Sequence, residues 1–144
     1  MFPSNIEIVL AADKTLPELG SGAYQKQVVV LALAEPESPV NKSFLDKVFA
    51  AANLDLGKDT LYVEVDPQTP INCFAGVSPQ PLYIIVFGLP MVQVGIKVQA
   101  QFYQPFSLSG TTWLFADPVS VLEPNRDKKG QLWAALKNLF LGKP

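Results

Sequence analysis

Four short hydrophobic runs along the chain predict the core strands of a sheet. Residues 28–34 (Val-Val-Val-Leu-Ala-Leu-Ala) are apolar throughout, and residues 60–65, 82–87 and 111–115 are mostly apolar segments of similar length. An apolar run without alternation is typical of a strand that is covered on both faces, as in parallel α/β sheets. We therefore predict four buried strands at these positions.

Residues 92–102 follow a different pattern, because apolar and polar positions alternate. Gln93, Lys97, Gln99 and Gln101 fall between apolar residues that occupy every second position. A period of two is typical of a strand with one buried and one exposed face. We predict an extra, half-exposed strand here, followed by a turn over residues 103–110.

Two stretches have helical spacing. The first follows Pro39, and Ser43 and Asp46 within it have the spacing of a capping box. The second is the last helix of the chain, for which Asn125 is the predicted N-cap. Its apolar stripe is predicted to pack on the sheet and consists of Leu132, Trp133, Leu136, Leu139 and Phe140.

The alternation of apolar strands with helical segments indicates an α/β fold with a mainly parallel sheet. In residues 1–27 the pattern fits a helix or a strand equally well, and Pro17, Gly20 and Gly22 favour a loose connection after it. We predict an N-terminal arm over residues 1–27 and a single domain over residues 28–144.

Composition narrows the classes of function. The 11 basic and 13 acidic residues give a net charge of −2, which disfavours nucleic acid as the dominant ligand but leaves a local basic patch possible. With Cys73 as the only cysteine, no intrachain disulfide forms, and a reducing compartment is the simpler expectation. The sequence contains neither a secretion signal nor an apolar run of membrane-spanning length, so we expect a soluble cytoplasmic protein that binds no membrane.

The absence of histidine removes most catalytic and metal-binding arrangements. The chain has no histidine and one cysteine, which excludes Ser-His-Asp triads, Cys-His dyads and Cys/His zinc sites. A carboxylate remains possible as a base, with Glu35 and Asp117 as candidates. Each also fits a structural role, Glu35 at a strand end and Asp117 at the start of a tight turn. We expect no cofactor, no metal and no catalytic site.

The last third of the chain carries a resemblance. A strand over residues 111–115, the turn Ala116-Asp117-Pro118-Val119-Ser120 and a helix with a basic start follow one another. This order resembles the C-terminal part of uracil-DNA glycosylase-like folds, where a strand leads into a His-Pro-Ser-Pro-Leu-Ser loop. It is more similar to the psi-subunit family of bacterial DNA polymerase III, a non-catalytic relative. The match covers about the last quarter of the chain well.

The resemblance implies a three-layer α/β/α fold, a reduced glycosylase-like sheet of four mainly parallel strands. It also implies a vestigial crevice at the carboxyl ends of the strands. The loop histidine of the enzymes would fall on Phe115 or Asp117, and the water-activating loop is absent after residue 34. The candidates for this crevice are Gly88, Pro90, Asp117, Pro118, Ser120 and Arg126.

The same resemblance implies a DNA replication accessory protein that acts by contacts with the clamp loader or a chi-like partner. Two alternatives are a divergent glycosylase-like DNA-binding or repair protein that uses Asp117, Ser120 and Arg126, and an interaction domain of an unrelated process. Arg126, the only arginine, forms a small basic cluster with Lys128 and Lys129, which suits either a phosphate contact or a solvated helix face.

A partner surface is predicted on the alternating strand and the aromatic turn after it. A long edge strand with little charge is prone to aggregate unless another segment protects it. We expect this segment to be a partner strand, a second copy of the chain or the chain's own N-terminal arm. The residues predicted to form this surface are Gln93, Lys97, Gln99, Gln101, Tyr103 and Phe106.

Overall fold

The computed structural model describes residues 20–35, 39–66, 77, 79–90 and 101–141. Its sheet has the strand order β2-β1-β3-β5-β4. Neighbouring strands are parallel except for β4, which runs antiparallel to β5. The α/β class and the four predicted core strands are therefore confirmed, and β4 is an addition. The strands are β1 (Val28–Leu33), β2 (Thr60–Val65), β3 (Tyr83–Phe87), β4 (Phe106–Leu108) and β5 (Thr111–Ala116).

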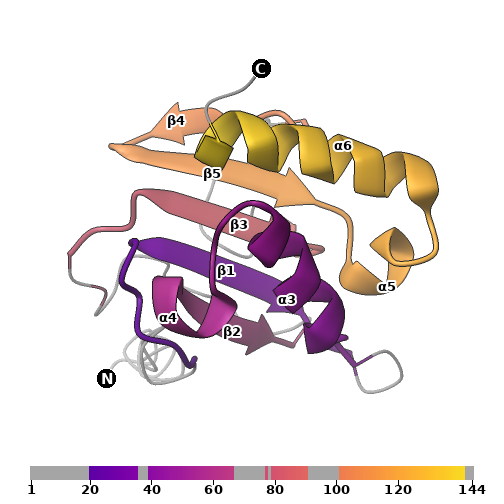
Figure 1. Cartoon of the computed structure of the whole chain (residues 1–144), viewed down its shortest axis with the longest axis horizontal. Helices are drawn as coiled ribbons and strands as arrows, with labels where there is room; N and C mark the ends of the chain where they lie inside the picture. Colours follow the sequence, from indigo (N-terminus) through magenta and orange to yellow (C-terminus); the bar gives the residue numbers. More distant parts are fainter. Residues whose placement is uncertain (1–19, 36–38, 67–76, 78, 91–100, 142–144) are drawn as a thin grey trace, which may run out of the picture.

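The described helices cover one face of the sheet. Figure 1 shows α3 (Lys42–Ala51) and α6 (Arg126–Leu136) in front of the strands, with the short helix α5 (Val119–Leu122) between β5 and α6. A one-turn helix α4 (Leu56–Asp59) leads into β2, and α6 continues into a π-helical turn, η2 (Lys137–Leu141). Among the described residues no helix packs on the opposite face, where the second core cluster consists of strand and loop residues, so they form two layers of the three predicted.

The two long helices begin at asparagine caps. The side chain of Asn125 accepts a hydrogen bond from Lys128 N at 3.0 Å, which confirms the predicted cap of α6. At α3 the cap is Asn41, whose Oδ1 accepts from Phe44 N at 3.3 Å. The predicted capping box of Ser43 and Asp46 is therefore wrong, because Asn41 already supplies the acceptor at the helix start.

The core strands are buried on both faces, as their apolar runs predicted. Val30, Ile85 and Leu114 are adjacent in register on the helix-covered face and belong to one core cluster. Their sequence neighbours Val29, Ile84 and Trp113 belong to a second cluster on the opposite face. The named residues of both clusters are fully buried. The predicted stripe of α6 packs on the first cluster: Leu132 and Leu136 are buried in it, and Trp133 is half-buried against it.

The two edges of the sheet differ. At the β2 edge, Ser21 and Tyr62 exchange two backbone hydrogen bonds of 2.9 and 2.8 Å. At the other edge, the outer side of β4 pairs with no strand among the described residues. Most of the predicted strand over residues 92–102 lies outside the described residues, and its last two residues adopt a loop and a turn.

Candidate functional site

The carboxyl ends of β3 and β5 lie in close contact at the predicted crevice. Gly88 N donates to Ala116 O at 2.9 Å, and Gly88 has a left-handed φ of +88°. A Cβ atom at this position would lie 2.9 Å from Pro118 Cγ, closer than real Cβ atoms come. Gly88 and Pro118 are thus packed together as predicted for neighbours at one rim, and no space for a ligand separates them.

Asp117, the next residue of this rim, accepts two hydrogen bonds on one carboxylate oxygen. Tyr103 Oη donates to Asp117 Oδ2 at 2.6 Å, and Lys128 Nζ donates to the same oxygen at 3.0 Å. Tyr103 Oη also accepts from Asp117 N at 3.2 Å. The Asp117 side chain is 13% exposed. We call these three residues the Asp117 network.

Each member of the network is fixed by its own element. Asp117 directly follows β5, and Lys128 lies in the first turn of α6, where its N–H is bound by the Asn125 cap. Tyr103 adopts a left-handed φ of +66°, and its N–H donates to Phe115 O at 2.9 Å. The network therefore joins the end of β5, the loop before β4 and the start of α6.

The network keeps the Tyr103 hydroxyl protonated. Burial raises the pKa of Tyr103, and the hydrogen bond to the Asp117 carboxylate raises this pKa further. The phenol therefore remains a donor throughout the neutral pH range. A general base must accept a proton from a reacting group, whereas Asp117 Oδ2 is already held by a phenol and an ammonium group. The geometry favours a structural role for Asp117.

The other predicted crevice residues do not join this network. Pro90, Ser120 and Arg126 are all exposed. Ser120 lies in α5, and Arg126 is the first residue of α6. Neither side chain forms a hydrogen bond or an ion pair with another described residue. The rim therefore has no convergent set of polar side chains beyond the Asp117 network in the part of the chain that the structure describes.

A groove lies between the loop before β4 and one side of α6. Its volume is about 340 Å³, and every lining residue is uncharged. Phe102 contributes an aromatic side chain that is 45% exposed, one of the large hydrophobic residues that the surface presents. We call this feature the amide groove. It is lined by Phe102, Tyr103, Gln104, Pro105, Gln131, Ala134, Ala135 and Asn138.

The predicted partner surface is placed only in part. Tyr103 lines the amide groove, but its hydroxyl is directed to Asp117. Phe106 is half-buried, and its ring stacks on that of Phe115 with centroids 6.2 Å apart. Gln101 is exposed. The remaining candidates, Gln93, Lys97 and Gln99, lie outside the described residues.

A second hollow is lined by acidic side chains, which serve the fold. Asp55 caps α4 by accepting from Gly57 N and Lys58 N at 2.9 and 3.0 Å. Asp59 Oδ2 accepts from Asp55 N at 2.8 Å and lies 3.8 Å from Lys26 Nζ. No set of three or more His, Cys, Asp or Glu residues is placed to hold a metal ion in the described ranges.

The chain matches no family model in a scan of protein families, and a search of curated proteins gives no match. Within the described residues, none of the helices combines the length and the apolar character needed to cross a bilayer. The surfaces described above are therefore the basis for inferring a function.

Proposed function

We propose that this chain is a non-catalytic protein-binding subunit whose partner docks at the amide groove. The observation that carries this proposal is an exposed aromatic side chain, Phe102, at the wall of an uncharged groove beside a sheet edge that pairs with no described strand. Interface cores are enriched in aromatic residues and depleted in charged ones.

The groove offers both an apolar floor and hydrogen-bonding walls. Ala134 and Ala135 present only methyl groups, which leaves room for a side chain of the partner. The carboxamides of Gln104, Gln131 and Asn138 can each donate and accept. Phe102 meets the Tyr103 ring edge to face, with centroids 6.1 Å apart, and Tyr103 is itself tied to Asp117. Phe102 therefore packs against a ring that is itself held in place by a hydrogen bond.

Strand β4 gives the partner a second means of attachment. It has only three residues, and its outer edge is unpaired among the described strands. An extended segment can pair with such an edge through backbone hydrogen bonds while a side chain enters an adjacent pocket. A short edge strand limits non-specific pairing, so the groove would supply the selectivity.

The more specific form of the proposal is a psi-like accessory role in DNA replication, through contacts with the clamp loader or a chi-like partner. It rests on the resemblance of the segment from Ser107 to Phe140. The position of Asp117 in a structural network supports the non-catalytic part of the proposal. A homodimer that forms through the same groove is the competing explanation, and the test must distinguish it from binding of another subunit.

The test is recovery of the partner with matched variants. We would isolate the tagged full-length chain from its native cells, identify stoichiometric partners by mass spectrometry and repeat the isolation with Phe102→Ala. Val121→Ala is the control, because Val121 is 40% exposed and lies on α5 away from the groove lining. We expect Phe102→Ala alone to lose a clamp-loader or chi-like subunit. Equal recovery with both variants, or a self-associated chain without another subunit, contradicts the proposal.

A further inference from the structure

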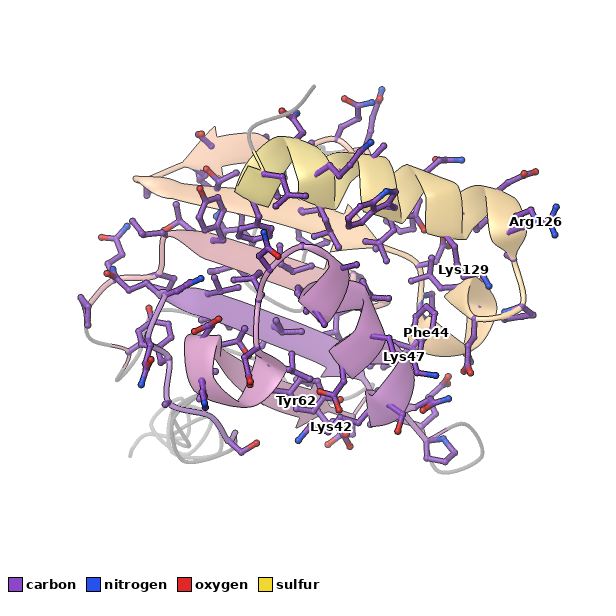
Figure 2. All side chains as sticks on the ribbon, in the orientation of Figure 1. Lys42, Phe44, Lys47, Tyr62, Arg126 and Lys129 are labelled. Carbon is purple, nitrogen blue, oxygen red and sulfur yellow. The ribbon has the colours of Figure 1, made fainter. Side chains whose placement is uncertain are left out.

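Four exposed cationic side chains lie on the two long helices. Lys42 and Lys47 belong to α3, and Arg126 and Lys129 belong to α6. Figure 2 shows these side chains along one side of the molecule, from the lower centre to the right of the view. We call them the basic face. Because the whole chain carries a net charge of −2, the basic face is a local concentration of positive charge.

None of the four cations of the basic face forms an ion pair with another described residue, although Lys42 lines a hollow together with Glu64. The side chains of Lys47, Arg126 and Lys129 form no ion pair or hydrogen bond within the part of the chain that the structure describes. Lys42 Nζ lies 5.2 Å from the centroid of the Tyr62 ring, a contact that orients the ammonium group but leaves its charge unpaired. By contrast, Lys128 is paired with Asp117.

Helix stability does not explain this placement. Lys42 and Arg126 are the first residues of their helices, and cations at this end oppose the helix dipole. The first turn of α3 contains no acidic residue that would offset Lys42, and the first turn of α6 contains only Asp127. An anion bound across the two helix starts would reverse the sign of this effect, because it is attracted by the cations and by the helix dipoles alike.

The two halves of the basic face are held in a fixed relation. Asn41 Nδ2 donates to Glu123 Oε2 at 2.7 Å, which links the residue that caps α3 to the end of α5. The ion pair of Lys128 with Asp117 ties the first turn of α6 to the end of β5. A ligand that bridges the two helices would therefore meet a preorganised surface.

The residues between the cations indicate the form of the anion. Figure 2 shows Phe44 between Lys47 and Lys129 in this view, and Phe44 is half-buried and packs against the first core cluster. Asp46 and Asp127 are exposed on the same helices and would repel a rigid double row of phosphates. A flexible single strand can place separate phosphates at the cations and a base against an aromatic ring.

We propose that the basic face binds single-stranded nucleic acid through its phosphate backbone. The ligand uses residues other than those of the amide groove, so the chain can hold a protein partner and a nucleic acid together. With three or four phosphates contacted, the logarithm of affinity falls with the logarithm of salt concentration at a slope of about −2 to −3. Affinity is modest, with Kd on the order of 10⁻⁵ M near physiological salt.

The experiment measures fluorescence anisotropy of a labelled oligothymidylate of about 20 nucleotides between about 50 and 200 mM salt. Lys47→Glu/Lys129→Glu is compared with Lys58→Glu/Lys137→Glu, which makes the same change in net charge on α4 and η2. We expect the first pair to weaken binding more than about tenfold and to flatten the salt slope, and the second to weaken it less than about threefold. Thermal melting of each variant verifies that it is folded.

Two further arms identify the anion. A duplex of equal length and a polyglutamate peptide of equal charge are tested against the same protein, and both should bind more weakly than the oligothymidylate. Equal loss in both variant pairs, no measurable binding at low salt, or tighter binding of the duplex or of the peptide overturns the proposal. Phe102→Ala should retain oligothymidylate binding, which separates a failure of this inference from a failure of the partner-binding proposal.

Discussion

Replacing Tyr103 with phenylalanine tests the Asp117 network without changing the packing of the ring. The variant removes a hydroxyl that donates to Asp117 Oδ2 at 2.6 Å and accepts from Asp117 N at 3.2 Å. Asp117 then keeps only the bond from Lys128 on that oxygen, and its N–H loses the acceptor that the hydroxyl provides. The variant therefore loses one charge-assisted hydrogen bond and leaves one backbone N–H without its acceptor.

The expected cost follows from these two terms. A hydrogen bond to a charged group contributes about 1.5–3 kcal/mol, and the Asp117 side chain is 13% exposed, so solvent replaces little of it. Asp117 as a residue is half-buried, so water can offset part of the bond that its N–H loses. We expect the free energy of unfolding of Tyr103→Phe to fall by about 2 kcal/mol, with Tm lower by roughly 5–8 °C for a chain of this length.

Urea denaturation followed by tryptophan fluorescence measures the change, with Tyr83→Phe as the matched control. Tyr83 is also half-buried, and its ring lies 4.7 Å from that of Phe140, but its hydroxyl forms no hydrogen bond with another described residue. The control should therefore change the free energy of unfolding by less than about 0.5 kcal/mol. If Tyr103→Phe is as stable as the control, the Asp117 network does not support the fold as argued here.

The same pair of proteins gives a pH dependence with a definite sign. The pKa of Tyr103 is raised in the folded state above the value of about 10 of an unfolded chain. The stabilisation from its protonated hydroxyl is thus fully present below pH of about 10 and is lost as pH rises toward the folded-state pKa. The difference in free energy of unfolding between the parent and Tyr103→Phe should shrink above that pH. A constant difference there refutes the assignment of the raised pKa to this hydroxyl.

Three further changes test separate parts of the structure. Trp113→Ala should cost about 3–5 kcal/mol and Trp133→Ala clearly less in urea denaturation, because the first side chain is fully buried and the second only half-buried; equal costs contradict this. Gly88→Ala should cost at least about 1 kcal/mol in the same assay, because of its φ of +88° and the contact with Pro118; a neutral change would show that this rim relaxes. Incubation with uracil-, thymine-mismatch- and hypoxanthine-containing duplexes should yield no abasic sites, and excision abolished by Asp117→Ala would reverse the non-catalytic proposal.

Local pattern was sufficient for the elements of this protein that depend on neighbouring residues. The mostly apolar runs predicted β1, β2, β3 and β5, because burial on both faces of a sheet leaves few positions for polar side chains. The Asn125 cap was also predictable from the sequence, because the side-chain acceptor and the N–H that it binds are only three residues apart. At the start of α3 the pattern predicted a capping box of Ser43 and Asp46, whereas Asn41 forms the cap.

The surfaces depend on contacts between residues that are distant along the chain. Tyr103 and Lys128 lie 14 and 11 positions from Asp117 in the sequence. The residues around Tyr103 give no indication that its hydroxyl donates to a carboxylate that follows the next two strands. The basic face arises in the same way, because the packing of α3 and α6 on one side of the sheet brings their cations together. Sequence thus determined which segments are buried, through hydrophobic periodicity, whereas only the tertiary structure decided which polar groups meet, since strand order and helix packing set those distances.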